Sequence, residues 1–246
     1  MAEKVEAGKP SVVDHAALTD VGREREHNED SFYSDPPVFA VADGMGGAQA
    51  GEVASGMAIE AVEAAHRAGE LPNRIVPVVE EANAKIHAAA REDSSQAGMG
   101  CTLTMAVVEE GEVVIAHVGD SRAYRLREGQ LEQLSEDHSL VAGLIKLGKL
   151  KPEDAATHPQ RSVILRALGP AAAVEVDVLH VEPQEDDVFL LCSDGLTGMV
   201  KDEVIQETLA SMPALDEALE TLIECANAAG GVDNITGVAF RLGRAV

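Results

Sequence analysis

Residues 38–52 read Val-Phe-Ala-Val-Ala-Asp-Gly-Met-Gly-Gly-Ala-Gln-Ala-Gly-Glu. The first five are apolar and typical of a short buried strand, which runs directly into Asp43-Gly44. A glycine-rich turn follows. Apolar side chains then recur at helical spacing over residues 52–68, which predicts a helix there. No Gly-Lys-Ser/Thr follows, so a phosphate-binding loop is disfavoured. The glycines instead allow close backbone approach, which lets the Gly44 carbonyl reach an ion beside Asp43.

Outward from this stretch, short apolar runs predict further strands at 102–108, 113–118, 174–181, 188–192 and 235–240. An extended start is expected near 16–20, and Glu110-Gly111 predicts a hairpin turn. Helical spacing predicts further helices at 75–91, 202–211 and 214–229. Strands and helices come in blocks and do not alternate one for one, so the sequence favours α+β layers over a doubly wound parallel sheet.

The ends of the chain and its overall composition narrow the possible classes. Residues 1–15 are polar, lack the apolar core of a signal peptide, and are expected to form a flexible leader. No repeat or low-complexity linker divides the rest, so 16–246 is expected to be one domain. The net charge of −24 and the 2% of aromatic residues disfavour nucleic acid and membrane surfaces as partners. A cytoplasmic protein is therefore expected.

The cysteines do not support a cysteine-based phosphatase. Cys101, Cys192 and Cys225 are too few and too scattered for a disulfide framework, and each lies in an apolar stretch. A cysteine nucleophile of that class needs an arginine six residues later to hold the oxyanions. No arginine stands at any of the three positions.

Four aspartates lie at strand ends next to glycine or another small residue: Asp43, Asp120, Asp194 and Asp233. Any one of them alone is explained by ordinary turn chemistry. Strand ends in a layered sheet lie near one another, so the four carboxylates are expected to converge. Converging carboxylates repel unless a cation neutralises them, and oxygen ligands suit Mg²⁺ or Mn²⁺.

A second polar cluster occupies residues 25–30, Arg-Glu-His-Asn-Glu-Asp. Taken alone, it is typical of a solvated charged turn. Arg25 is nevertheless of the residue type that binds a phosphate through two parallel hydrogen bonds.

In this order, the blocks resemble the metal-dependent protein phosphatase family of type 2C (PPM), in its compact bacterial branch of Ser/Thr phosphatases. The resemblance spans roughly residues 16–242. The matching stretches are Asp20-Val-Gly22, Arg25-Glu-His-Asn-Glu-Asp30, Val41-Ala-Asp-Gly-Met-Gly-Gly47, Gly51-Glu52, Gly100-Cys-Thr102, His117-Val-Gly-Asp-Ser-Arg-Ala-Tyr124, Glu136-Asp-His-Ser-Leu-Val141, His158-Pro-Gln-Arg161, Arg166-Ala-Leu-Gly169, Cys192-Ser-Asp-Gly-Leu196 and Asp233-Asn-Ile-Thr236.

The resemblance implies an α-β-β-α sandwich of two antiparallel sheets flanked by helices, with a metal centre at one end. It implies that Asp43 bridges two Mn²⁺ or Mg²⁺ ions, that the Gly44 carbonyl binds the first, and that Asp194 and Asp233 complete the second. Asp120, with Asp194, would hold a third ion. Glu29 and Asp30 would hold metal-bound waters. Arg25 would clamp the substrate phosphate, and residues 139–169 would form a flap beside the site.

The implied activity is hydrolysis of phosphoserine and phosphothreonine in proteins by a hydroxide that bridges two metal ions. The resemblance further implies signal transduction in opposition to bacterial Ser/Thr protein kinases, by a protein expected to be a monomer. Met45 stands where many eukaryotic members have a histidine, so that general acid is absent and protonation of the leaving group comes from water or elsewhere. His138 and His158 lie in or near the flap, but lone histidines are more often structural than catalytic. Two rival functions stay open: a catalytically silent binding module, and an enzyme devoted to one phosphorylated regulatory partner.

Overall fold

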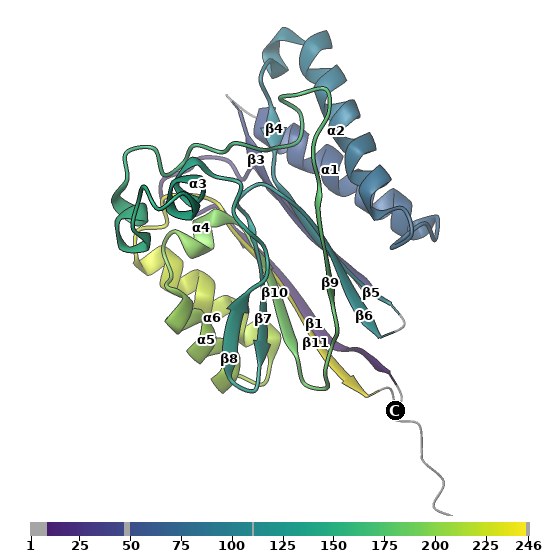
Figure 1. Cartoon of the computed structure of the whole chain (residues 1–246), viewed down its shortest axis with the longest axis vertical. Coiled ribbons are helices and arrows are strands. Elements are labelled where there is room, and N and C mark those ends of the chain that lie inside the picture. Colours follow the sequence, from purple (N-terminus) through teal and green to yellow (C-terminus); the bar gives the residue numbers. More distant parts are fainter. Residues whose placement is uncertain (1–8, 47–49, 110, 245–246) are drawn as a thin grey trace, which may run out of the picture.

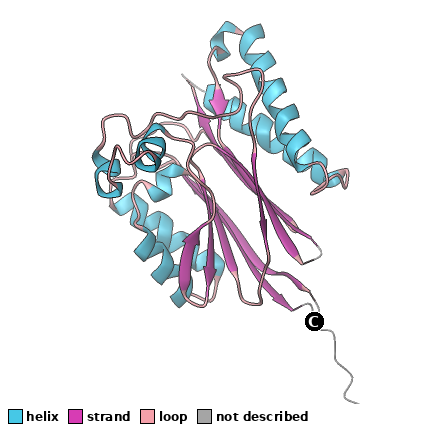
Figure 2. Ribbon diagram, in the orientation of Figure 1, coloured by secondary structure: helices cyan, strands magenta, loops and turns pink. Residues whose placement is uncertain are grey.

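The structure is a computed structural model of the chain, and it describes residues 9–46, 50–109 and 111–244. Two antiparallel β-sheets pack face to face, and helices cover the outer face of each sheet (Figures 1 and 2). The predicted α-β-β-α sandwich of the α+β class is therefore confirmed.

Both sheets are built from short strands that lie far apart in the sequence. The first sheet has the order β1 (Pro10–Asp20), β11 (Ile235–Arg244), β10 (Val188–Cys192), β7 (Arg122–Arg127) and β8 (Gln130–Gln133). The second has the order β2 (Asp30–Asp35), β3 (Val38–Met45), β5 (Leu103–Glu109), β6 (Glu112–Val118) and β9 (Asp177–Val181), with β4 (Gly100–Cys101) paired to β3.

Two pairs of helices form the outer layers. Helices α1 (Ala50–Arg67) and α2 (Ile75–Glu92) pack on the second sheet, and α5 (Asp202–Ser211) and α6 (Leu215–Ala228) pack on the first, as Figure 1 shows on opposite sides. The shorter elements are α3 (Leu140–Lys146), α4 (Asp194–Thr197) and the 3₁₀ turns η1 (Ser94–Gln96) and η2 (Pro152–Thr157).

The core consists of three apolar layers, one under each helix pair and one between the sheets. The rings of Phe39 on β3 and Phe240 on β11 stack between the sheets with centroids 4.3 Å apart. Phe189 on β10 stacks on Phe240 at 5.0 Å. All three rings are fully buried, so half of the six Phe and Tyr side chains in this chain hold the two sheets together.

The structure corrects the expected start of the first strand. Strand β1 begins at Pro10, and its pairing with β11 extends from Pro10↔Arg244 to Asp20↔Ile235. The leader predicted over 1–15 is therefore too long, and residues 1–8 lie outside the described part. Because β1 is an edge strand, polar residues such as Asp14 and His15 are tolerated in it, and these obscured the strand pattern.

The remaining elements agree closely with the sequence, with a few additions. Strands β5 and β6 pair from Leu103↔Val118 to Glu109↔Glu112, as a hairpin requires; Glu110 of the predicted turn lies outside the described residues. Strands β2, β7 and β8 are further elements that the sequence pattern did not indicate. Within the described residues, no helix has the length and apolar character needed to cross a membrane.

Candidate metal centre

The four aspartates predicted at strand ends lie together at one end of the sandwich. Asp43 is part of β3 and Asp120 follows β6 in the second sheet. Asp194 begins α4 directly after β10, and Asp233 precedes β11 in the first sheet. The charge of Asp43 interacts with Asp120, Asp194 and Asp233. Each sheet thus contributes two carboxylates to one cluster.

A fifth carboxylate, Asp30, joins this cluster from the neighbouring strand. Asp30 on β2 is paired with Asp43 on β3 in the sheet register. Its Oδ2 accepts a 2.8 Å hydrogen bond from the Ser193 hydroxyl, which in turn accepts one from the Thr236 N–H. Ser193 therefore links the two sheets at the cluster, a role that the sequence pattern did not reveal.

Burial and mutual repulsion shift the protonation of these carboxyl groups. Burial, followed by repulsion from Asp30 and Asp194, raises the pKa of Asp43 well above its ordinary value. Burial also raises the pKa of both Asp30 and Asp120 to about 7, with repulsion from Asp194 adding to each. The fold therefore concentrates acidic groups whose ionised forms are destabilised by burial and by one another, as metal and catalytic sites do.

Two carboxylate oxygens in this cluster have no hydrogen-bond partner in the described part of the chain. They are Oδ1 of Asp30 and Oδ1 of Asp120, and both are buried. An unpartnered carboxylate oxygen inside a protein is costly, because its hydration is lost without replacement. A divalent cation is a partner that satisfies such oxygens.

The side chains of the cluster contact one another as they stand. Asp43 and Asp194 lie close enough for their charges to repel, and Arg25 donates to Asp233 Oδ2 at 2.7 Å. In residues 9–46, 50–109 and 111–244, no three His, Cys, Asp or Glu side chains are arranged as a ready ligand set. The donors present are nonetheless hard oxygens with unsatisfied lone pairs, so by their chemistry they fit Mg²⁺ or Mn²⁺.

The backbone around Gly44 leaves no room for a side chain. A Cβ atom at this position would lie 2.4 Å from the Glu29 carbonyl oxygen and 2.3 Å from that of Gly51. The Gly44 N–H donates to the same Glu29 carbonyl at 3.1 Å, and the Ser55 hydroxyl donates to it at 2.6 Å. The glycine thus lets three segments meet beside Asp43, and Glu29 lies among them.

The loop that carries Arg25 is held in place by Asn234, which is buried. The Asn234 amide oxygen accepts from the Glu29 N–H at 2.8 Å, and its amide nitrogen donates at 2.9 Å to the carbonyls of Val21 and His27. One side chain therefore fixes both ends of the loop around Arg25. Asn234 belongs to the matching stretch Asp233-Asn-Ile-Thr236, but the sequence pattern did not predict that its side chain holds the Arg25 loop.

Thr102 connects Asp43 to the turn that carries Asp120. The Thr102 hydroxyl accepts from the Asp43 N–H at 2.9 Å, and the Thr102 N–H donates to the Asp43 carbonyl at 2.8 Å. The same hydroxyl lies 2.7 Å from the Ser121 hydroxyl. The Thr102 and Ser121 side chains are fully buried, and this network connects two of the carboxylate-bearing segments.

The segment 139–169 folds back on itself beside this end of the sandwich. It contains α3 and η2, and its two limbs are joined by a bridge between Ser139 and Ile164. Leu168 exchanges backbone hydrogen bonds with Cys101 of β4, which ties the end of the segment to the second sheet.

Cys101 and Cys192 are unsuited to nucleophilic chemistry. Burial raises the pKa of the Cys101 thiol, and it raises that of Cys192 to about 12. Both thiols are fully buried and stay protonated, so neither supplies a thiolate.

A sandwich of two antiparallel sheets with clustered carboxylates and an arginine at one end defines the class of metal-dependent phosphatases. The family model described as "Protein phosphatase 2C" matches residues 22–236. The chain therefore belongs to the protein phosphatase 2C family.

Individual relatives agree with the family match. "Serine/threonine phosphatase stp" of Listeria monocytogenes is 44% identical over 230 residues, which are 89% of this chain and 91% of that protein. The crystal structure of the Mycobacterium tuberculosis Ser/Thr phosphatase PstP/Ppp is similar with a TM-score of 0.89 and 40% identity, covering 95% of this chain and all of that one. The PstP catalytic domain "in complex with 2 Manganese ions" is similar with a TM-score of 0.87 and 37% identity, over 94% and 99% of the two chains.

Proposed function

We propose that this protein hydrolyses phosphoserine and phosphothreonine in other proteins and requires a divalent metal ion to do so. The observation that carries the proposal is the cluster of five buried or half-buried aspartates beside the guanidinium of Arg25; two of them have an oxygen with no hydrogen-bond partner among the described residues. The relatives named as Ser/Thr phosphatases and the manganese complex of PstP support it.

The clustered carboxylates and the residues beside them are the proposed metal ligands. Asp43, the Gly44 carbonyl, Asp194 and Asp233 would together hold two Mn²⁺ or Mg²⁺ ions. Asp120, together with Asp194, provides a third site. Glu29 and Asp30 orient metal-bound waters. The bound cations supply charge neutralisation and lower the pKa of a coordinated water so that it is a nucleophile near neutral pH.

Arg25 binds the substrate phosphate. Its side chain is 48% exposed, so it is accessible to a protein substrate, and its contact with Asp233 holds it at the carboxylate cluster. The guanidinium has five N–H donors in a planar fork, a geometry that matches two phosphate oxygens. It offsets the negative charge of the transferring phosphoryl group. Asn234 keeps the loop that presents Arg25 rigid.

The proposed substrates are phosphorylated proteins, and the proposed cellular role is to oppose Ser/Thr protein kinases in the cytoplasm as a monomer. The phosphatase names of the relatives support the substrate class. Mn²⁺ is the proposed preferred ion, supported by the manganese in the PstP complex.

The test is release of inorganic phosphate from phosphothreonine, phosphoserine and phosphotyrosine peptides by the purified chain. We expect release from the first two with Mn²⁺, little from phosphotyrosine, and none with excess chelator. Folded protein that releases no phosphate from several peptides with Mn²⁺ or Mg²⁺ would favour a silent binding module instead. Activity that persists in chelator would refute metal dependence.

A further inference from the structure

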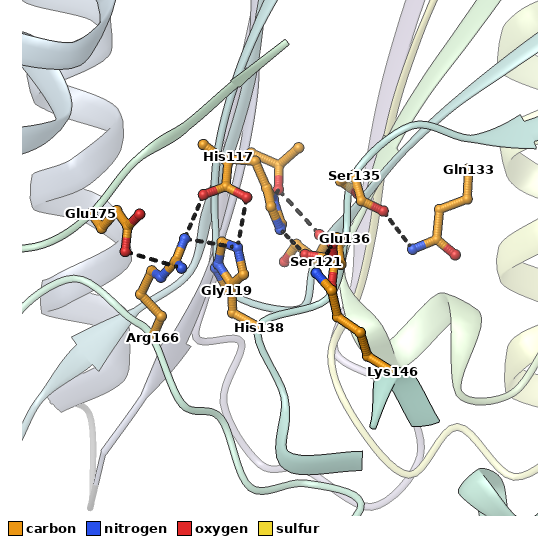
Figure 3. Close-up of polar contacts among 12 residues, drawn as sticks. His117, Gly119, Ser121, Gln133, Ser135, Glu136, His138, Lys146, Arg166 and Glu175 are labelled. Carbon is orange, nitrogen blue, oxygen red and sulfur yellow. Dashed lines mark hydrogen bonds and ion pairs between the residues drawn. The ribbon is translucent and has the colours of Figure 1, made fainter. Parts of the chain in front are cut away.

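We propose that His138 is a positioning residue that fixes the turn carrying Asp120 and couples this turn to both limbs of the segment 139–169. The proposal rests on the assignment of Asp120 as a metal ligand. Figure 3 shows His138 between Gly119 on one side and Arg166 on the other.

His138 and Gly119 are joined by two reciprocal hydrogen bonds. The His138 N–H donates to the Gly119 carbonyl at 2.7 Å, and the Gly119 N–H donates to Nδ1 of His138 at 3.0 Å. Gly119 has φ of +117°, and a Cβ there would lie 2.5 Å from Cγ2 of Thr102. The turn is therefore confined between Thr102 and His138, and Asp120 is its next residue.

These contacts fix the tautomer of the His138 ring. Because Nδ1 accepts a hydrogen bond from an amide, Nε2 carries the ring proton. Nε2 lies 3.2 Å from Oδ2 of Asp177, the first residue of β9, to which it donates, and 3.0 Å from Nη1 of Arg166. The other oxygen of Asp177 accepts from Arg166 at 2.5 Å, and Arg166 also pairs with Glu175 at 3.4 Å. The carboxylate of Asp177 thus holds both His138 and Arg166.

The ring of His138 also packs against the ring of a second histidine. His117 lies against it with ring centroids 4.7 Å apart. His117 is held in turn by the Thr104 hydroxyl at 2.9 Å and by the Glu136 carbonyl at 3.1 Å. Only 8% of the His138 side chain is exposed, so the ring has no freedom to turn.

Both limbs of the segment 139–169 meet this histidine. The first limb begins at the residue that follows His138. The second limb returns to it, since the Leu165 N–H donates to the His138 carbonyl at 2.7 Å and Arg166 comes next. A displacement of the segment therefore acts on His138, and through the two bonds to Gly119 it acts on the position of Asp120. Arg166 and Asp177 influence Asp120 without touching it.

The proposed role of His138 differs from that of a merely structural histidine. The two nitrogens have separate duties: Nδ1 sets the Asp120 turn, and Nε2 connects it to Asp177 and Arg166. Glutamine places its amide near Nε2 and asparagine places its amide near Nδ1. His138→Gln is expected to free the Gly119 N–H, whereas His138→Asn keeps an acceptor for it and loses the connection to Asp177.

The experiment measures two quantities for wild type, His138→Gln, His138→Asn and Arg166→Gln. One is the hydrogen-exchange rate of the Gly119 amide in chelator. The other is the Mn²⁺ concentration that gives half-maximal phosphate release. His180→Gln is the matched control, because His180 lies on β9, the strand that carries Asp177, and its exposed ring pairs with Glu112. Each variant is repeated in an Asp120→Asn background.

We expect His138→Gln to accelerate Gly119 exchange and to raise the Mn²⁺ requirement by about tenfold or more, as loss of a ligand-orienting contact does. His138→Asn and Arg166→Gln should raise the requirement less, with the peptide KM little changed. In the Asp120→Asn background His138→Gln should add nothing. Unchanged Gly119 exchange, or the same fold-increase with and without Asp120, would overturn the proposal. If wild type neither binds Mn²⁺ nor releases phosphate, the proposed function fails, while Gly119 exchange still tests the contact.

Discussion

Arg25 donates a 2.7 Å hydrogen bond to Oδ2 of Asp233, a residue 208 positions further along the chain. The contact joins the loop between β1 and β2 to a residue two positions before the start of β11. It places the proposed phosphate-binding group against a proposed metal ligand, so the substrate phosphate and the cations share one surface at the end of the sandwich.

Replacement of Arg25 tests phosphate binding. Arg25→Ala is expected to lower kcat/KM for a phosphothreonine peptide by about 10- to 100-fold, because hydrogen bonds to charged groups contribute about 1.5–3 kcal/mol. Arg25→Lys should recover only part of this loss, since lysine lacks the planar fork. Arg23→Ala, two residues away and also exposed, is the control in the same steady-state assay. Equal activity of Arg25→Ala and Arg23→Ala would contradict the assignment.

Removal of the Asn234 side chain tests how the Arg25 loop is held. Asn234→Ala leaves the Glu29 N–H and the carbonyls of Val21 and His27 without this partner. Orphaned buried groups of this kind cost about 1–3 kcal/mol each, so we expect the free energy of unfolding to fall by about 2–4 kcal/mol. Denaturant unfolding measures this loss. The peptide KM should rise as well; an unaltered KM and stability would show that the loop is held by other contacts.

Removal of the metal should reverse the effect of Asp43→Asn on the stability of the protein. Without metal, the buried charge of Asp43 opposes folding: the unfolded chain loses this proton near pH 4 and the folded chain only at higher pH, so stability falls as pH rises. In chelator at pH 8, Asp43→Asn should therefore melt above wild type. With Mn²⁺ at about 100 times its Kd, wild type should gain about 5–10 °C and melt above the variant. Thermal melts in both conditions check this; identical order in both would contradict it.

A separate pH dependence is expected from His117. Burial, with a smaller effect of the neighbouring His138, lowers the pKa of His117 to about 4 from its ordinary 6.5. Between these values the unfolded chain binds a proton that the folded chain does not, so stability falls as pH drops from 6.5 to 4. The loss attributable to this group is about 3 kcal/mol. His117→Gln should flatten the unfolding free energy across this pH range, and a slope as steep as that of wild type would refute the assignment.

Much of the fold follows from local sequence patterns. The apolar runs at 38–42, 113–118 and 188–192 are fully buried strands, and the helices with apolar stripes appear within two residues of the predicted bounds. Strand β8 was missed because only Leu131 among its four residues is apolar. Strand β1 was shortened because Asp14 and His15 interrupt its apolar pattern at a sheet edge. Such strands are specified by their pairing partners, which a local pattern does not reveal.

The carboxylate cluster could be anticipated because each aspartate carries its own local mark, a strand end beside a small residue. The residues that hold the cluster carry no such mark. Ser193, Thr102 and Asn234 act across the two sheets or between distant loops, and their partners lie up to 213 positions away. His138 was noticed only as a histidine near the flap; its bonds to Gly119 and Asp177 exist because the folded chain brings these segments together.

The most direct test of the metal-dependent phosphatase site is phosphate release from a phosphothreonine peptide by wild type, Asp233→Asn and Asp186→Asn, with Mn²⁺ and with excess chelator. Asp186 is exposed and has φ of +69°, a conformation that asparagine also tolerates, so it is a matched control. We predict that wild type and Asp186→Asn are active with Mn²⁺ and inactive in chelator. Asp233→Asn should lose at least about 100-fold of the rate, because the metal ions supply several kcal/mol of charge stabilisation. An Asp233→Asn variant as active as the control, or activity that survives chelation, would contradict the account.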